Sequence, residues 1–494
     1  MAFDEPTNVD DDRVAAPLGT PLDHPLYVDL DGTLYPGDSL WDTVALVIAR
    51  WPLEVLRIPL VLLRGPLAAK AWLVDKAMLD ASLLPYRGDL VDLCRGERGR
   101  GRRVVLATAA HRRIAEAVAG HLGCFDTIIA TDVVNRKSTA KLAAIRDDTA
   151  AAPFLYAGDS ESDRPIWSAS AGALTAGRAA NWPAERVHTE VLARFPDSQS
   201  RLRAFLKALR PHQWVKNILV FVPLVASHRL FDSQSILASV IVFVAFCLAA
   251  SSAYLLNDIV DLENDRAHHR KRRRPLAAGT LPIIWALPMI PGLLVAAIAL
   301  AALTTPAAVG VLILYYAVTV GYSLDLKRRM LVDVFTLAGL YTLRCLAGHA
   351  ATAIPYSPWL IGFTIFLFLS LAFAKRHSEL FHLRLAGERD VKGRGYRAGD
   401  LELITMFGVA AGFMAALVMG LYVTSDAVTL LYDAPMVLWS LCPLVLYWIS
   451  RVWLITHRGQ LHDDPIVFAL RDRMSYVVAA MAAALLVAAT VLPG

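Results

Sequence analysis

Long apolar runs alternate with short basic segments through the second half of the chain, and this pattern restricts the fold more than any other feature. A helix needs roughly 20 apolar residues to cross the bilayer core. From about residue 217 onward we interpret nine runs as such spans, at about 214–229, 236–256, 281–303, 307–324, 331–349, 357–374, 402–423, 433–450 and 475–493. The sequence therefore predicts a polytopic all-α membrane bundle of about nine helices.

The basic residues between the runs predict an orientation. If the first half is cytoplasmic, the inner loops are 257–280, 325–330, 375–400 and 451–474, and they hold 20 lysines and arginines against one, Arg229, outside. This asymmetry follows the positive-inside rule. An odd number of spans then places the C-terminus outside. We expect a multi-pass protein of the inner (cell) membrane with cytoplasmic active sites.

Charge and cysteine usage narrow the class further. The net charge of +5 comes from basic residues beside apolar runs, which favours anionic lipids and phosphorylated substrates over nucleic acid. Five scattered cysteines suggest neither a disulfide framework nor a zinc site. The first 25 residues are acidic and lack an apolar core, so we expect no signal peptide. The oligomeric state is left open.

A polar segment follows the second apolar run directly. Asn257 and Asp258 come first, and Asp258, Asp261 and Asp265 recur at three- and four-residue spacing, which places them on one helix face. Converging carboxylates repel one another without a cation, and Mg²⁺ takes such carboxylates together with phosphate oxygens. The alternative is a solvated polar end of a helix. We expect a Mg²⁺ site that binds a phosphorylated substrate.

Cations gather at the same predicted membrane face. The run from Arg270 to Arg274 is either a topology signal or a clamp for pyrophosphate, since arginine makes bidentate phosphate contacts. Further polar residues lie at the ends of other spans: Tyr322, Lys327, Lys375 and Arg376. Each of them alone fits a simple interfacial role as well as it fits a role in substrate binding.

Taken in order, the motifs NDxxDxxxD, RRRPLAAG, YSxxLKxxxxxDV and a later KR-SE pair resemble the UbiA-type intramembrane transferases, over about 205–494. The resemblance implies a helical bundle with a cavity open to lipid and Mg²⁺ between a diphosphate and aspartates. It makes Asp258 and Asp261 catalytic and adds Asp265 as a third metal ligand. Asp325 and Asp333 do not form the second acidic motif of typical aromatic prenyltransferases.

One subgroup of that family is similar in more detail. The segments RPHQWVKN (210–217), YSxxLK and HDDPIVFALRDR resemble decaprenyl-phosphate phosphoribosyltransferases. This similarity implies phosphoribosyl diphosphate as donor and a polyprenyl phosphate as acceptor. The substrate-binding residues expected from these motifs are Lys216, Asn257, Arg274, Tyr322, Lys327, Lys375 and Arg376.

The first half of the chain places polar residues after short apolar strands. Asp29 and Asp31 follow the strand at 26–28, where one carboxylate suits a nucleophile and the other a general acid and base. Thr108 follows a second strand as a phosphate-binding hydroxyl. Asp159 and Asp163 follow a third in an acidic turn suited to Mg²⁺.

With a lysine on the intervening helical segment, these motifs resemble the haloacid dehalogenase superfamily over roughly 22–185. The resemblance implies an α/β, Rossmann-like phosphatase with a helical cap at about 35–101 and an aspartyl phosphate on Asp29. Thr108 and Lys141 would hold the phosphoryl group, with Lys137 as the less favoured lysine. Mg²⁺ would be bound by Asp29, Asp31, Asp159 and Asp163.

The remaining segments complete a two-domain plan. We expect a disordered tail at 1–21, the phosphatase domain at 22–185, a helical connector at 186–210 and the transferase domain at 211–494. The apolar cap segment 42–64 either lies on the membrane and collects a lipid-linked substrate, or forms a buried cap core or a contact with the transferase.

Fusion of the two domains suggests consecutive reactions. The transferase would make polyprenyl-phosphoryl-5-phosphoribose, and the head would remove the 5-phosphate to give polyprenyl-phosphoryl-ribose, with tethering favouring the second step. Two alternatives remain. One is a prenyltransferase that uses a prenyl diphosphate and an aromatic acceptor beside an unrelated phosphatase, and the other is a head that only regulates or docks.

Overall fold

The computed structural model describes residues 17–491 except 133, 135, 198, 228, 230, 386, 388–394 and 462–464, and it contains two compact units. The first unit combines Met1–Leu209 with Tyr254–Met289, and the second combines Arg210–Ala253 with Ile290–Gly494. The acidic motif and the loop behind it thus pack with the N-terminal half. Most of the predicted tail, and the HDD triplet near the C-terminus, lie outside the described residues.

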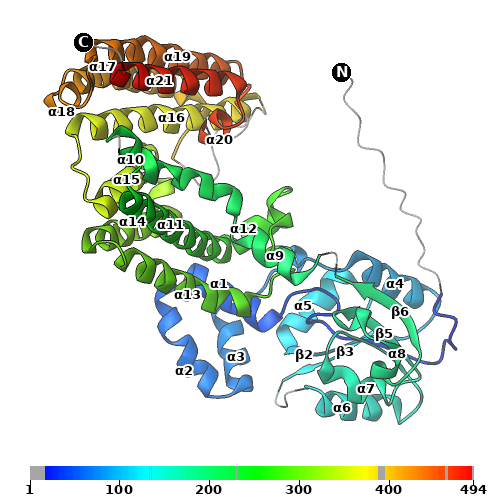
Figure 1. The fold of residues 1–494 in the computed structure, drawn as a ribbon. Coiled ribbons are helices and arrows are strands. Elements are labelled where there is room, and N and C mark those ends of the chain that lie inside the picture. The colour runs from blue at the N-terminus through cyan, green and yellow to red at the C-terminus, as the bar shows by residue number, and fades with distance from the viewer. Residues whose placement is uncertain are drawn as a thin grey trace. The chain divides into compact units, whose positions relative to one another are not determined.

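The first unit is built on one parallel sheet of six strands in the order β3-β2-β1-β4-β5-β6 (Figure 1). The strands are β1 (Leu26–Val28), β2 (Val104–His111), β3 (Thr127–Thr131), β4 (Leu155–Gly158), β5 (Gly172–Gly177) and β6 (Val191–Pro196). The chain order reverses between the central neighbours β1 and β4. In such sheets ligands bind beyond the carboxyl ends of the strands at this reversal. The predicted α/β head is confirmed.

Both faces of the sheet are covered by helices, because successive strand residues point to opposite faces. Leu26 and Val28 pack toward α4 (Gly88–Gly99) and α5 (Arg112–Leu122) in one buried cluster. Tyr27 lies in a second cluster on the other face, with α6 (Thr139–Thr149) and α7 (Arg164–Trp167). The central strands are therefore buried on both sides, and they hold the loops at their carboxyl ends in place.

Between β1 and β2 the chain forms the helical insertion expected of a cap. It contains α1 (Ser39–Arg50), the 3₁₀ helix η1 (Pro52–Leu56), α2 (Ile58–Leu63), α3 (Pro66–Lys76) and the 3₁₀ helix η2 (Ala81–Leu83). Asp38 caps α1 by accepting hydrogen bonds from the amides of Leu40 and Trp41. Pro52 and Pro59 fall where the apolar segment breaks, because proline disrupts a helix interior.

The helical connector predicted for 186–210 is wrong for its central part. Residues Val191–Pro196 form β6, the edge strand, which pairs in parallel with β5. Leu192, Ala193 and Phe195 pack against the core of the first unit, and this burial outweighs the local sequence preference. Two helices frame the strand, the short α8 (Ala184–Val187) and α9 (Arg201–Ala208).

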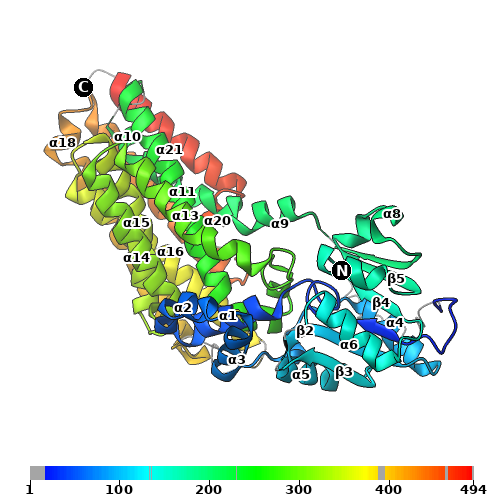
Figure 2. The same cartoon turned by 90° about the horizontal axis from the view of Figure 1, so that it is seen from below.

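The second unit is helical. Its spanning-length helices lie side by side in Figure 2, where α14 (Pro306–Leu324), α15 (Val332–Thr352) and α16 (Pro358–Leu385) pack in sequence order. The other long helices are α17 (Leu401–Val423), α19 (Leu441–His457) and α21 (Arg473–Val491). Two further helices, α11 (Ser233–Val260) and α13 (Ile283–Ala302), run from one unit into the other.

Seven helices within the described residues are long and apolar enough to cross a membrane, and they coincide with seven of the nine predicted spans. The other two differ in character. Residues 214–229 form a 3₁₀ helix, η5 (Pro211–Phe221), followed by the short α10 (Val222–Ala226). Residues 331–349 lie in α15, a full-length helix that carries Asp333 and Arg344, both buried. Nine spans are therefore not confirmed as such.

Candidate active site

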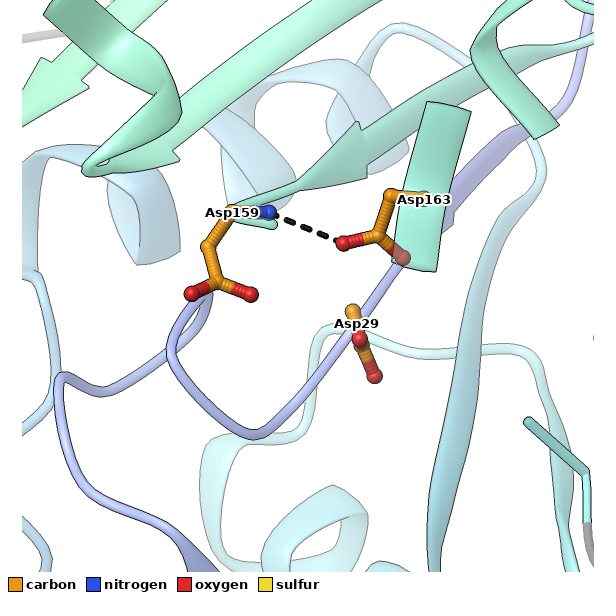
Figure 3. A group of neighbouring side chains, drawn as sticks. All are labelled: Asp29, Asp159 and Asp163. Carbon is orange, nitrogen blue, oxygen red and sulfur yellow. Dashed lines mark hydrogen bonds between the residues drawn. The ribbon is translucent and has the colours of Figure 1, made fainter. Parts of the chain in front are cut away.

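The carboxylates predicted for the head meet at the reversal of the sheet. Asp29 directly follows β1, and its amide donates to the carbonyl of Ala157 in β4 at 3.1 Å. Asp159 directly follows β4. Asp163 lies in the acidic turn that follows, and its carboxylate accepts a hydrogen bond from the amide of Asp159 at 3.1 Å (Figure 3). One oxygen from each of the three aspartates lies within 4.8 Å of the others.

Lys141 connects two of these carboxylates. Its Nζ lies 2.8 Å from Oδ2 of Asp29 and 3.9 Å from Oδ1 of Asp163, and its side chain is 3% exposed. Nζ also donates to the hydroxyl of Tyr156 at 2.9 Å, and that hydroxyl donates to Asp163 at 2.7 Å. The structure thus brings Lys141 to the predicted nucleophile and fixes it there through a buried network.

Asp31 lies in the loop between β1 and α1, and it is hydrogen-bonded to the first residue of α1. Its carboxylate accepts the amide of Ser39 at 2.7 Å and the hydroxyl of Ser39 at 3.0 Å. It is not part of the group of three aspartates, so its predicted metal contact stays a prediction. Its position at a helix N-terminus keeps it oriented toward the same cavity as Asp29.

Thr108 lies in β2 and is fully buried. Its Oγ1 accepts the amide of Ala110 at 3.0 Å, so the side chain fixes the irregular end of β2. Ala109, in the same end of the strand, lines the cavity beside Asp29. The predicted contact between the Thr108 hydroxyl and a phosphoryl group therefore stays a prediction.

Burial gives the carboxyl groups different proton affinities. Desolvation raises the pKa of Asp29 to about 6, opposed by the charge of Lys141. Desolvation together with the charges of Asp163 and Asp29 raises the pKa of Asp159 to about 8. Burial, and then the charges of Asp38 and Asp29, hold the pKa of Asp31 well above its usual value. Environments that separate neighbouring carboxyl groups in this way are typical of acid and base pairs.

The cavity at this edge has a volume of about 590 Å³. Besides the aspartates and Lys141, its lining includes residues that sequence reasoning did not single out as site residues, such as Lys70 of α3. Lys70 donates to the carbonyl of Ala109 at 2.5 Å. No motif marks Lys70, because a cap residue is brought to the site by packing alone. Lys137, the less favoured lysine, lines the same cavity.

Arg87 was also missed, and it holds the loop after β1. Its side chain donates to the carbonyls of Gly32 and Thr33, each at 3.0 Å, and forms an ion pair with Asp197 at 2.8 Å. Gly32 has φ +74°, and a Cβ there would lie 2.3 Å from Oδ2 of Asp159. A glycine directly after Asp31 is thus required by both the backbone and the close carboxylate.

The acidic motif at the end of α11 does not form the single helix face that its spacing predicts. The helix ends at Val260, and a new helix, α12 (Leu262–Ala267), begins after Asp261. Arg274 bridges Asp258 at 3.2 Å and Asp265 at 2.6 Å, and both carboxylates are almost fully buried. Asp261 accepts from the Asn257 amide at 3.1 Å. The structure thus places the guanidinium of Arg274 between two carboxylates of the acidic motif.

The remaining predicted substrate-binding residues belong to the second unit. Lys216 is nearly buried and lies over the ring of Tyr341, 5.9 Å from its centroid. Tyr322 ends α14, Lys327 lies in the following 3₁₀ turn, and Lys375 lies in α16, all three partly exposed. Their predicted contacts with substrate stay predictions.

Arg376, also of the second unit, is fully buried and pairs with Asp333 at 2.7 Å and with Glu379. The hydroxyl of Tyr396 also donates to Asp333. Asp325 instead pairs with Arg329 at the surface, at 2.6 Å. Asp333 is thus engaged in a buried ion pair, and phosphate binding by Arg376 stays a prediction.

Comparison with known families agrees with this architecture. Residues 218–477 match the UbiA prenyltransferase family, and residues 26–168 match the haloacid dehalogenase-like hydrolases. The chain belongs to the UbiA prenyltransferase family and carries a haloacid dehalogenase-like domain at its N-terminal end. Together with its apolar helices, this membership makes it an integral membrane protein with the domains of an enzyme.

Three relatives extend the comparison. Uncharacterized protein y4nM of Sinorhizobium fredii is 37% identical over 470 residues, 94% of this chain and 91% of that protein. Nodulation protein NoeC of Azorhizobium caulinodans is 34% identical over 55% of this chain and 89% of its own length. A decaprenyl-phosphate phosphoribosyltransferase of Mycolicibacterium smegmatis is 33% identical over 55% of this chain and 88% of its own length. The fused arrangement is thus shared along nearly all of y4nM.

Proposed function

We propose that the chain is a bifunctional membrane enzyme. Its membrane domain transfers 5-phosphoribose from phosphoribosyl diphosphate to a polyprenyl phosphate, and its head removes the 5-phosphate to give polyprenyl-phosphoryl-ribose. The observation that carries the proposal is the joining of two features in one chain. One is the likeness of the membrane half to a decaprenyl-phosphate phosphoribosyltransferase, and the other is a phosphatase-type cluster of Asp29, Lys141, Asp159 and Asp163.

In the first reaction an oxygen of the polyprenyl phosphate forms a bond to C1 of the ribose, and pyrophosphate leaves. Asp258, Asp261 and Asp265 are the proposed carboxylates of this site, with Arg274 as a cation for the diphosphate. The support from the structure is local. Arg274 already contacts Asp258 and Asp265, so small movements of one side chain exchange a carboxylate partner for a phosphate.

In the second reaction Asp29 attacks the phosphorus of the 5-phosphate as the bond from phosphorus to the ester oxygen breaks. Asp31 gives its proton to that leaving oxygen, and then takes a proton from the water that hydrolyses the aspartyl phosphate. The arrangement supports these roles. Lys141 favours the ionised form of Asp29, whereas burial raises the pKa of Asp31 and so favours its protonated form.

Mg²⁺ is the proposed ion of both sites, and the carboxylates of the head fit it by their geometry. In the head, oxygens of Asp29, Asp159 and Asp163 converge within 4.8 Å, and carboxylate oxygens are the ligands that Mg²⁺ prefers. Mg²⁺ would neutralise charge on the phosphoryl oxygens there. Asp163 also accepts amides of its own loop, so it holds the turn that presents Asp159.

A membrane assay tests the donor. Membranes with the full chain, polyprenyl phosphate and Mg²⁺ are given either labelled phosphoribosyl diphosphate or a labelled prenyl diphosphate with an aromatic acceptor. We expect lipid-soluble label from the phosphoribosyl donor, its loss in Asp258→Asn, and its retention in Asp29→Asn. Product from the prenyl donor alone would replace the proposal with an ordinary prenyltransferase.

We also propose that both sites face the cytoplasm and that the C-terminus lies outside, on the strength of the basic inner loops. A reporter enzyme fused after Gly494 should be active only on the outer side of the inner membrane. Activity on the cytoplasmic side would reverse the orientation.

A further inference from the structure

The cap of the head carries a surface of exposed apolar side chains. Trp51, Leu53, Leu56, Leu60 and Leu63 are 54%, 85%, 79%, 62% and 83% exposed, and we call these five residues the apolar face. Trp51 directly follows α1, and the four leucines lie in η1 and α2, so the apolar face spans thirteen consecutive residues. A contiguous group of this kind on a protein surface marks an interaction site more often than isolated apolar residues do.

The same segment is anchored from its other side. Ile58 and Val61 are each 7% exposed and pack inward. The short helices are therefore two-sided, with one side fixed to the cap and the other directed outward. This is the arrangement of an element that presents its leucines to an apolar environment outside the head.

Basic side chains border the apolar face. Arg57, between η1 and α2, and Arg64, directly after Leu63, are both exposed. Lys76 lies at the end of α3. The one acidic residue in this stretch, Glu54, is neutralised by Arg57 at 3.2 Å and Lys76 at 3.0 Å. An apolar face with a basic border matches the surface of a bilayer that contains anionic lipids.

The apolar face leads directly to the phosphatase cavity. Helix α3 starts at Pro66, three residues after Leu63, and Pro66 and Lys70 line that cavity with the catalytic aspartates. Pro282 and Ile284, at the start of α13, line the same cavity. Because α13 is long and apolar enough to cross a membrane, the cavity borders the first turn of a candidate membrane span.

We propose that the apolar face rests in the surface of the bilayer and holds a lipid-linked phosphomonoester so that its phosphate reaches Asp29. The part of this proposal that concerns the substrate rests on the proposed phosphatase function. The part that concerns the membrane contact stands on the exposed leucines and their basic border alone. Water-soluble phosphate esters would reach the same cavity without using the apolar face.

A spin label tests the membrane contact independently of activity. The full chain, with Cys442→Ala to remove the one cysteine that is not buried, is labelled at Leu63→Cys or, as a matched control, at the half-exposed Leu22→Cys before β1. It is placed in nanodiscs of phosphatidylcholine and phosphatidylglycerol. We expect the label at 63 to be accessible to oxygen and shielded from a water-soluble nickel chelate, with the reverse at 22.

Two outcomes would overturn the contact. A label at 63 that is open to the nickel chelate places the apolar face in water. A label at 63 that is shielded from both reagents places it against protein, either another part of this chain or a second copy.

Hydrolysis tests the substrate. The double variant Leu60→Gln, Leu63→Gln should release phosphate from polyprenyl-phosphoryl-5-phosphoribose about tenfold more slowly than the wild type. The reason is that two leucines lose their apolar contact with the bilayer. Hydrolysis of p-nitrophenyl phosphate should be unchanged, and Leu22→Gln should change neither. Equal loss on both substrates would refute the role of the apolar face. A wild-type chain that hydrolyses neither ester would refute the phosphatase function, while the spin labels still decide the contact.

Discussion

The buried ion pair between Asp42 and Arg266 connects helix α1 of the head with α12, the helix that contains Asp265 of the acidic motif. Nη2 of Arg266 lies 2.8 Å from Oδ2 of Asp42, and the two side chains are 4% and 2% exposed. Nε of Arg266 also donates to the carbonyl of Ala277 at 3.1 Å. Removing one partner of such a pair costs about 3–5 kcal/mol, because the other charge stays desolvated.

Arg266→Met and Asp42→Asn should therefore each lower the free energy of unfolding of the first unit by roughly 3–5 kcal/mol. For a unit of this size, 1 kcal/mol corresponds to a shift of about 2–4 °C in Tm, so we expect a drop of about 6–20 °C. The double variant should cost less than the sum of the single ones, since no unpaired charge remains. Thermal unfolding of the detergent-solubilised chain measures all three.

A matched control lies on the same two helices. Arg50 pairs with Glu263 at 2.9 Å, but the side chains are 46% and 30% exposed, and exposed pairs contribute only about 0–1 kcal/mol. Arg50→Met should thus shift Tm by no more than a few degrees. If Arg266→Met behaves like Arg50→Met, or if the Arg266 and Asp42 effects simply add, the joining of α1 to α12 through a buried pair is refuted.

Three further predictions follow from the sites. Gly32→Ala should abolish phosphatase activity and lower Tm, because a Cβ at φ +74° would lie 2.3 Å from Oδ2 of Asp159; normal hydrolysis of p-nitrophenyl phosphate would contradict this. In chelator, Tm of the head should fall between pH 5 and 8, because folded Asp159, with its pKa near 8, keeps a proton that the unfolded chain releases near pH 4; Mg²⁺ should raise Tm most at pH 8, and Asp159→Asn should flatten the slope, whereas an unchanged slope would contradict the reasoning. Arg274→Ala should abolish transfer of labelled phosphoribose, because the buried Asp258 and Asp265 would lose the guanidinium that bridges them, while p-nitrophenyl phosphate hydrolysis should persist; full transfer would remove Arg274 from the site.

The sequence predicts which polar residues of the head lie together, because these residues follow strands. Asp29 and Asp159 sit directly after β1 and β4, and neighbouring parallel strands bring their carboxyl ends together. Lys141 was preferred over Lys137 from its helical segment, and it is the lysine that contacts Asp29. Lys70 and Arg87 could not be found this way, since only packing of the cap and loop brings them to the site.

The membrane half shows the limits of apolar periodicity. The run at 331–349 does form a helix, but Asp333 and Arg344 make its interior polar, and both are buried among neighbouring helices. β6 was missed because Val191–Pro196 is short and flanked by charged residues, and its pairing with β5 is a long-range effect. The break at Asp261 escaped notice because spacing alone predicts a continuous helix.

The central claim is that one chain adds phosphoribose to a lipid and then removes the 5-phosphate. Phosphoribosyl diphosphate labelled with ¹⁴C in the ribose and ³²P in the 5-phosphate tests it directly, in membranes with polyprenyl phosphate and Mg²⁺. We predict that ¹⁴C stays in the lipid fraction while ³²P appears as free phosphate, and that Asp29→Asn keeps both labels in the lipid. Both labels in the wild-type lipid would contradict the second step, and neither label in the lipid would contradict the first.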